Sequence, residues 1–270
     1  MSSSAPIPQP CDFVIPFHPK DAPVFFTYTL PHLLKHAIGL RTIFLITSKK
    51  TLTLFPFSTT PQIQLVFEEE FPFTLEDIAQ ICQNRGRTSW YYQQVLKLYA
   101  HRVLREKLLE EYVIWDSDTI LLKPTPFFLN DFGEIQGLFA ISPEYNPPYM
   151  EHMERLLPEI RRLDPQWGGV THHQPWKKKW TETLLLQIEW RHGRMAWKAY
   201  LEKVDQKHWG GSGCADYEIM MAWVFRHHGS EANIRPLRWA NRRELPNPSE
   251  QLDFVALHEH MMPLVPTSSA

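Results

Sequence analysis

Residues 112–124, YVIWDSDTILLKP, carry an apolar run straight into two aspartates and then continue with further apolar residues. A buried carboxylate without a partner costs on the order of several kcal/mol of free energy, or it takes up a proton. Asp116 and Asp118 must therefore meet a partner or lie at the edge of a sheet. The run before them is typical of a buried strand, so we expect that strand to end at Asp116.

The rest of the chain alternates short apolar runs with amphipathic segments. A strand is expected at 12–17, a helix at 30–39 that ends at Gly39, and a second buried strand at 40–48. This order is typical of a parallel βαβ unit. Further strands are expected at 63–70, 119–122, 138–142, 234–239 and 253–260, and helices at 75–82, 87–111, 150–163, 177–191, 194–204 and after the Gly-rich segment 209–213.

Nothing in this pattern separates two domains. We predict one α/β domain at 11–262, built on a mixed, mostly parallel sheet flanked by helices. A flexible, Pro-rich arm is expected at 1–10 and a loose tail at 263–270. The segment 168–175 is expected to be a strand end and a loop, and Thr88 or Ser89 is expected to cap the long helix.

The composition limits the class of partner. The chain has 28 Lys and Arg against 30 Asp and Glu among 270 residues, which gives no support to nucleic acid or an anionic membrane as a partner. The three cysteines lie far apart, so neither a disulfide framework nor a structural zinc site is expected. The first ten residues do not resemble a signal peptide, and no apolar run approaches the roughly 18 residues of a membrane span. We therefore expect a soluble cytoplasmic protein without a transmembrane segment.

The two aspartates are candidate metal ligands. Alternate residues of a strand face opposite sides, but a turn at the strand end lets both carboxylates face one crevice. In open α/β sheets this end of the strands is where ligands bind, and two hard oxygen donors suit Mg²⁺ or Mn²⁺. The alternative is a capped turn in which Asp116 and Asp118 bond nearby backbone N–H groups.

Six segments in order resemble one known family: DFVIPFHPKD, RTSWYYQQVLKLYA, YVIWDSDTILLKP, VTHHQP, SGCADYEIMMAWVF and DFVALHEHM. Together they resemble the DUF6492 family of glycosyltransferases, over residues 12–261. The resemblance implies the GT-A fold, a Rossmann-like fold of nucleotide-diphospho-sugar transferases. It implies inverting transfer of a sugar from a nucleotide-diphosphate donor, with a UDP-sugar favoured, to a hydroxyl of a glycan or other acceptor, with Mn²⁺ or Mg²⁺ as cofactor.

In this family the loop after the first strand holds the nucleotide. Here that loop contains Pro16, His18, Lys20 and Asp21. Lys20 is expected to meet phosphate, and Asp21 to accept a hydrogen bond from ribose or uracil. The alternative is a solvated turn.

The long helix and the aspartate turn supply the next candidates for binding the donor. Trp90, Gln94 and Lys97 recur three or four residues apart, so they share one flank of the helix. Arg87 precedes that helix and is placed to approach the same diphosphate, and Ser117 between the aspartates joins the donor-binding set. A solvated helix face explains the Gln and Lys residues equally well.

Two adjacent histidines follow in the segment 168–175. The side chains of His172 and His173 point different ways, so at most one is expected to face the site. Its role would be a hydrogen bond to the donor sugar or the acceptor, or metal binding by neutral imidazole. The alternative is a loop pair that is satisfied by backbone groups.

The helix after the Gly-rich segment offers a general base. Inverting transfer needs a carboxylate that takes the proton of the acceptor hydroxyl. Asp216 is the first candidate and Glu218 the second; the alternative is that Asp216 or Ser212 only caps the helix. If configuration is instead retained, Asp216 would orient the acceptor.

The last candidate lies near the end of the chain. Many GT-A enzymes take a third metal ligand from a C-terminal histidine, and the resemblance points to His258, with His260 in reserve. The expected metal ligands are then Asp116, Asp118 and His258.

Two other functions remain open. A sugar-nucleotide nucleotidyltransferase would share the fold but should show a Gly-rich basic loop after the first strand, and VIPFHPKD has no glycine. A non-catalytic carbohydrate-binding protein would not need the D-x-D, the Lys flank and a late histidine together.

Overall fold

The computed structural model describes residues 6–53, 60–83 and 86–257. Its α-helices are α1 (Ala22–Val24), α2 (Leu30–His36), α3 (Leu75–Ile81), α4 (Thr88–Leu104), α5 (Pro147–Leu156), α6 (Lys178–His192), α7 (Ala196–Glu202) and α8 (Asp216–His227). Its strands are β1 (Ile7–Pro8), β2 (Cys11–Pro16), β3 (Ala37–Ile38), β4 (Leu40–Thr47), β5 (Ile63–Phe67), β6 (Glu111–Trp115), β7 (Thr119–Leu121), β8 (Thr125–Pro126), β9 (Phe128–Asp131), β10 (Glu134–Phe139), β11 (His173–Lys177), β12 (Ala232–Ile234), β13 (Trp239–Arg242) and β14 (Phe254–Leu257).

The central sheet has five strands in the order β11-β6-β2-β4-β5. Strands β6, β2, β4 and β5 are parallel, and β11 pairs antiparallel with β6 at one edge. The chain runs outward from β2 to β4 and β5, then crosses back to place β6 on the other side of β2. This confirms a mixed, mostly parallel α/β sheet. The strand order reverses between β2 and β6, which makes that point the topological switch point of the sheet.

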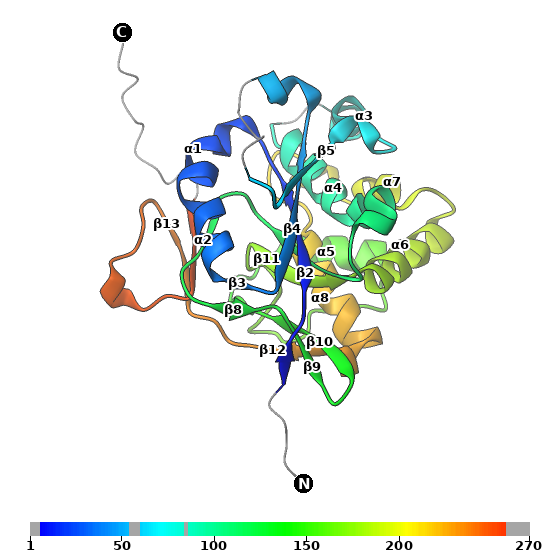
Figure 1. The fold of residues 1–270 in the computed structure, drawn as a ribbon. Helices are drawn as coiled ribbons and strands as arrows, with labels where there is room; N and C mark the ends of the chain where they lie inside the picture. The colour runs from blue at the N-terminus through cyan, green and yellow to red at the C-terminus, as the bar shows by residue number, and fades with distance from the viewer. Residues whose placement is uncertain (1–5, 54–59, 84–85, 258–270) are drawn as a thin grey trace.

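The two faces of this sheet bury different sides of the same strands. In β2, Val14 joins one hydrophobic cluster while Phe13 and Ile15 join another. Strand β6 divides in the same way, with Ile114 in the first cluster and Trp115 in the second. Figure 1 shows α1 and α2 to one side of the central strands and α3, α4, α6, α7 and α8 to the other. Strands buried on both faces explain why their sequences are nearly continuous apolar runs.

A small second sheet brings the end of the described chain to the D-x-D turn. Strand β14 lies between β13, to which it is parallel, and β7, to which it is antiparallel. Because β7 follows Asp118 directly, the last described residue, Leu257, donates its N–H to the Asp118 carbonyl at 2.9 Å. Another sheet, in the order β1-β9-β10-β12, lies outside the central one.

Several expected boundaries are wrong. The segment 168–175 was expected to be a strand end and a loop, but residues from His173 onward form β11. The strand and the helix expected at 138–142 and 150–163 are β10 (Glu134–Phe139) and α5 (Pro147–Leu156). The helix expected at 30–39 stops at His36, because Ala37 and Ile38 pair with β8. The long helix is not capped by Thr88 or Ser89, since Arg87 holds the N-cap position without a capping side-chain bond.

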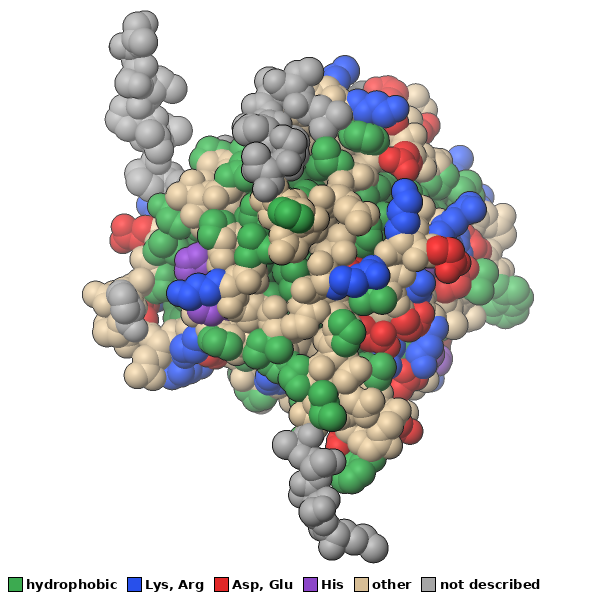
Figure 2. All heavy atoms as spheres, viewed as in Figure 1, with side chains coloured by type: hydrophobic (Ala, Val, Ile, Leu, Met, Phe, Trp, Pro, Cys, Tyr) green, Lys and Arg blue, Asp and Glu red, His purple; other side chains and the backbone are tan. Residues whose placement is uncertain are grey.

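The ends of the chain are described only in part. Ile7–Pro8, which we assigned to the flexible arm, pairs antiparallel with β9. Residues 1–5 and 258–270 lie outside the described residues. On the face seen in Figure 2, basic and acidic side chains lie among one another. Within the described residues, none of the helices combines the length and the apolar character that crossing a membrane requires.

Candidate functional site

The turn after β6 is fixed by its own backbone and by a neighbouring loop. The Asp116 N–H donates to the His172 carbonyl at 2.9 Å, and the Thr119 N–H closes the turn on the Asp116 carbonyl at 3.0 Å. The Ser117 hydroxyl donates to Asp21 at 2.7 Å, which joins this turn to the loop after β2. The carboxyl ends of β2 and β6, on either side of the switch point, are therefore linked directly.

The Asp116 carboxylate meets three donors. Lys97 from α4 donates to Asp116 Oδ1 at 2.6 Å, and the Tyr217 hydroxyl from α8 donates to the same oxygen at 2.9 Å. The Nδ1 atom of His172 lies 3.4 Å from Oδ2. The charge that the sequence left without a partner is thus met by three separate segments of chain. Tyr217 was not among the expected site residues, because its place between two candidate carboxylates is its only signal in the sequence.

Lys97 lies between two carboxylates. Its ammonium is also 3.5 Å from Asp216 Oδ2 and lies over the Tyr217 ring, 4.3 Å from the centroid. Burial lowers the pKa of Lys97, but Asp116 and Asp216 outweigh burial and raise it. Lys97 is therefore a permanently charged buried cation, and we name Lys97, Asp116, Asp216 and Tyr217 the carboxylate cluster.

The two aspartates of this cluster differ electrostatically. Burial raises the pKa of Asp116, but the charges of Lys97 and His172 and their hydrogen bonds hold it well below its usual range. For Asp216, burial dominates over the attraction of Lys97 and raises the pKa. One carboxylate is thus a fixed anion, while the other is shifted toward the range of a proton acceptor.

Asp216 is the first residue of α8 and does not cap it. The N-cap is Ala215, and no side chain caps this end. The Asp216 N–H instead donates to Gln94 Oε1 at 3.1 Å, an oxygen that also accepts from the Tyr200 hydroxyl at 2.6 Å. Gln94, which we expected to bind the donor, is buried and holds the start of α8 in place. The Asp216 side chain is consequently available to point at Lys97.

Glu218 contacts other residues than Asp216 does. It accepts the Gly169 N–H at 3.0 Å and lies 3.4 Å from the Arg162 guanidinium. Burial raises the pKa of Glu218, while Arg162 opposes that shift. The structure therefore brings Asp216, and not Glu218, to Asp116 and Lys97.

The loop after β2 is a short turn. Pro16 is buried as the last residue of β2, and the exposed His18 accepts the Lys20 N–H on its Nδ1 at 3.2 Å. Lys20 is exposed, and Asp21 is tied to Ser117 as described. His18 thus stabilises the turn that carries Lys20 beside the D-x-D segment.

Arg87 and Trp90 form a pair at the start of α4. The Arg87 guanidinium lies over the Trp90 ring, 4.6 Å from its centroid. Trp90 is seven residues before Lys97, so it lies on the same flank about two turns away. Neither residue has a described contact with the carboxylate cluster.

The side chains of His172 and His173 lie in different surroundings. His172 has a φ of 62°, a backbone conformation that few residues other than glycine adopt, and its ring faces Asp116. His173 is fully buried against Trp115 and Phe254, and burial lowers its pKa to about 3. The structure thus places His172 at the site and His173, also expected to bind the donor, in the hydrophobic core.

The residues expected to bind metal fit a cation in part. The three donors around Asp116 already engage both of its oxygens, whereas Asp118 is half-buried at the turn. His258 lies outside the described residues, and no group of three or more candidate ligands occurs within them. Among the expected ligands, Asp118 is the hard oxygen donor that the turn presents next to the end of β14.

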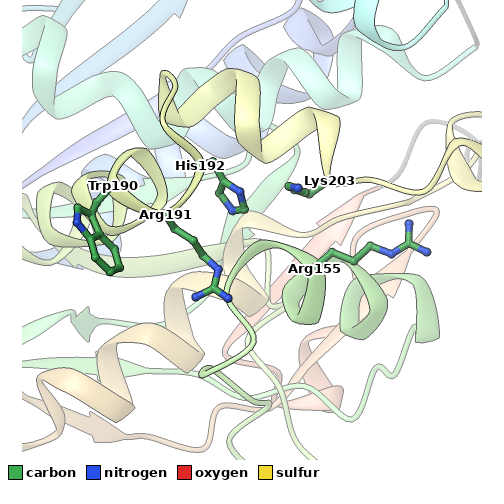
Figure 3. A pocket seen from close by; sticks show the side chains of 5 residues that line it. All are labelled: Arg155, Trp190, Arg191, His192 and Lys203. Carbon is green, nitrogen blue, oxygen red and sulfur yellow. The ribbon is translucent and has the colours of Figure 1, made fainter.

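Among the hollows on the surface of the described residues, two are lined by tryptophan side chains. One, of about 920 Å³, is lined by Trp167 and Trp239 and by residues 141–144, 236–238, 240, 241 and 252; we name it the tryptophan cleft. The other, of about 550 Å³, is lined by Arg155, Trp190, Arg191, His192 and Lys203 (Figure 3). Its arginines are paired with Asp205 and Glu159. No residue from the carboxyl ends of β2 or β6 lines this second hollow.

No model of a known protein family matches the chain, and no curated protein matches it. The resemblance of its motifs to a glycosyltransferase family therefore stays a prediction.

Proposed function

We propose that this protein is a metal-dependent glycosyltransferase of the GT-A fold that transfers a sugar from a nucleotide diphosphate, with UDP favoured, to a hydroxyl acceptor. One observation carries the proposal: the D-x-D turn and the loop after β2 meet at the switch point of the sheet, joined by the bond from Ser117 to Asp21. Ligands of open α/β sheets bind at such a point.

The loop after β2 and the D-x-D turn would contact different parts of the donor. Lys20 is exposed beside the D-x-D turn, so its ammonium suits a phosphate oxygen. The Asp21 carboxylate, held by the buried Ser117 hydroxyl, suits a ribose hydroxyl or a base N–H group. A divalent cation held by Asp118, with His258 as a further ligand, would neutralise the charge that grows on the leaving diphosphate.

The carboxylate cluster supplies the proton acceptor. Asp216 is buried beside the Lys97 ammonium, and its raised pKa brings it closer to the range in which a general base works. Lys97 holds Asp116 as an anion on its other side. We infer that Asp216 takes the proton of the acceptor hydroxyl as that oxygen attacks the anomeric carbon, with inversion of configuration.

Release of UDP from a panel of UDP-sugars with Mn²⁺ tests the proposal directly. We expect turnover of at least one donor, abolition of that turnover in Asp118→Ala, and an unchanged unfolding midpoint. Asp131→Ala is the matched control, because Asp131 ends β9 in the outer sheet. Binding of sugars without UDP release would instead favour a non-catalytic carbohydrate-binding protein.

A further inference from the structure

No residue of the carboxylate cluster lines the tryptophan cleft, but the first turn of α8 supports the wall of the cleft. Ser142 and Gly168 exchange backbone hydrogen bonds of 2.9 and 2.8 Å. These bonds join residues 141–144 of the cleft wall to the segment that carries Trp167. Glu218, two residues after Asp216, accepts the Gly169 N–H. The first turn of α8 thus fixes both the general-base candidate and the wall of the cleft.

A buried arginine supports the same wall. The Arg162 side chain is 6% exposed, lies 3.4 Å from Glu218, and donates to the Glu144 carbonyl at 2.7 Å. Glu144 itself lines the cleft. A buried ion pair therefore supports the wall of the cleft.

A ring contact between Trp239 and His172 joins the lining of the cleft to the D-x-D site. Trp239 stacks on Phe254 at a centroid distance of 5.3 Å, and its ring is 5.4 Å from that of His172. His172 is the imidazole beside Asp116. The indole N–H of Trp239 donates to the Ile141 carbonyl at 3.2 Å, which anchors the ring in the cleft wall.

The lining of the cleft combines flat apolar surfaces with polar groups. Trp167 is 41% exposed, and Trp239 is half-buried. Glu144, Arg238 and Asn241 provide charged and amide groups along the same lining. Few polar groups around an aromatic surface are typical of a small-molecule site. A pyranose ring matches this lining, because it has apolar C–H faces and hydroxyl groups around its edge.

We propose that the tryptophan cleft binds a sugar residue of the acceptor, so that the acceptor is a carbohydrate. This inference rests on the proposed function, because it takes the D-x-D turn as the donor side. Trp167 and Trp239 stack on the faces of the sugar ring, while the polar lining groups bond its hydroxyls. Glu218 is a positioning residue of this cleft, because it acts through the backbone at Gly169.

Saturation-transfer NMR with the methyl β-glycosides of glucose, galactose, mannose and N-acetylglucosamine tests the cleft. We expect at least one glycoside to bind with a Kd on the order of 1 mM or weaker, as few contacts hold so small a ligand. Trp167→Ala should weaken that binding by about tenfold, since it removes an aromatic platform. Trp190→Ala is the matched control, as Trp190 is 79% exposed and lines the other hollow.

A second measurement separates this inference from the function on which it rests. UDP with Mn²⁺ should raise the unfolding midpoint of Trp167→Ala as much as that of the wild type, because the donor side is intact. Absent glycoside binding, or equal binding by wild type and Trp167→Ala, would overturn the acceptor cleft even if UDP release persists. Displacement of the glycoside by a UDP-sugar but not by UDP would also overturn it, because the donor sugar would then occupy the cleft.

Discussion

The buried Lys97 lies between Asp116 and Asp216, so the charge of each of these three side chains depends on the other two. Removing one partner of a buried ion pair leaves an uncompensated charge at a cost of roughly 3–5 kcal/mol. Lys97 has two anionic partners, so Asp116 still compensates it when Asp216 becomes neutral. Because Asp116 remains an anion, Asp216 can take a proton during a reaction without leaving Lys97 unpaired.

The substitution Asp216→Asn tests this residue. Asn keeps the size of the side chain but does not take up a proton, so transfer should fall by about 100- to 10,000-fold. Binding of UDP should persist, since Asp116, Asp118 and the loop after β2 are unchanged. Initial rates of transfer and UDP-dependent thermal shifts measure the two effects separately.

Glu218→Gln is the matched control for that substitution. Gln still accepts the Gly169 N–H but leaves Arg162 without its buried anion. We expect lower stability and, because Arg162 supports the wall of the tryptophan cleft, weaker binding of the acceptor, with a nearly normal transfer rate at saturating acceptor. Loss of transfer in Glu218→Gln together with an active Asp216→Asn would move the base to Glu218. If both variants transfer sugar and the product retains its anomeric configuration, the inverting mechanism is wrong.

His173 predicts a dependence of stability on pH. Burial lowers its pKa to about 3, so the native state stays unprotonated down to that pH, while the unfolded chain takes up a proton near pH 6.5. Between these values the unfolded state binds more protons, and the free energy of unfolding falls as the pH is lowered. His173→Phe should remove up to about 1.4 kcal/mol per pH unit of that slope.

Urea unfolding at several pH values between 4 and 7, roughly the window set by these pKa values, measures the slope. His152, whose pKa burial lowers to about 4, contributes a slope of its own in both proteins. An identical slope in wild type and His173→Phe would show that His173 is protonated without cost in the native state.

At the scale of the element, the sequence indicates strands and helices where the environment is simple. Strands β2, β4 and β6 are buried on both faces, so their apolar runs were recognisable. Strand β11, HQPWK, has no such run, and its Lys177 is satisfied by Ile135 and Glu231 far along the chain. Local patterns do not contain such distant partners, which is why the sequence predicts a strand end and a loop at 168–175 in place of β11.

Some residues of the candidate site can be recognised in the sequence, whereas others depend on distant contacts. The place of the D-x-D at a strand end and the place of Lys97 on a helix flank mark both as candidates, and the structure joins Lys97 to Asp116 itself. The bond from Tyr217 to Asp116 spans 101 residues, and the bond from Asp216 to Gln94 spans 122. Whether Gln94 faces a ligand or the start of α8 depends on how α4 and α8 pack, which is a tertiary property that helical spacing alone does not determine.

The contact between α8 and β11 is tight at one glycine. A Cβ at Gly169 would approach Gln174 Nε2 and the Tyr217 carbonyl at 2.5 Å each. Gly169→Ala should therefore displace α8, lower stability by about 1–3 kcal/mol, and reduce transfer by shifting Tyr217 away from Asp116. Gly210→Ala is the control, since a Cβ there meets nothing within 4 Å. Thermal unfolding and initial rates that match between the two variants would contradict this role of Gly169.

At the scale of the whole molecule, the site joins segments from across the chain. The loop after β2, the start of α8 and the end of β14 converge on the turn after β6, directly or through Lys97. The topology produces this convergence, because β2 and β6 adjoin at the switch point and β14 pairs with β7 immediately after the turn. A ligand that bridges these segments should stabilise the fold as a unit.

Ligand binding at this junction should be linked to the stability of the whole fold. A ligand that binds only the native state adds about 2.7 kcal/mol to stability at 100 times its Kd. UDP with Mn²⁺ should therefore raise the unfolding midpoint well beyond the effect of either alone, because the cation and the diphosphate bind together. Leu257, the last described residue, donates its N–H to the Asp118 carbonyl. We expect His258→Ala to raise the Mn²⁺ concentration needed for the shift, and His260→Ala to change it little. The reverse result would assign the ligand to His260, and normal shifts in both variants would exclude a C-terminal histidine from the metal site.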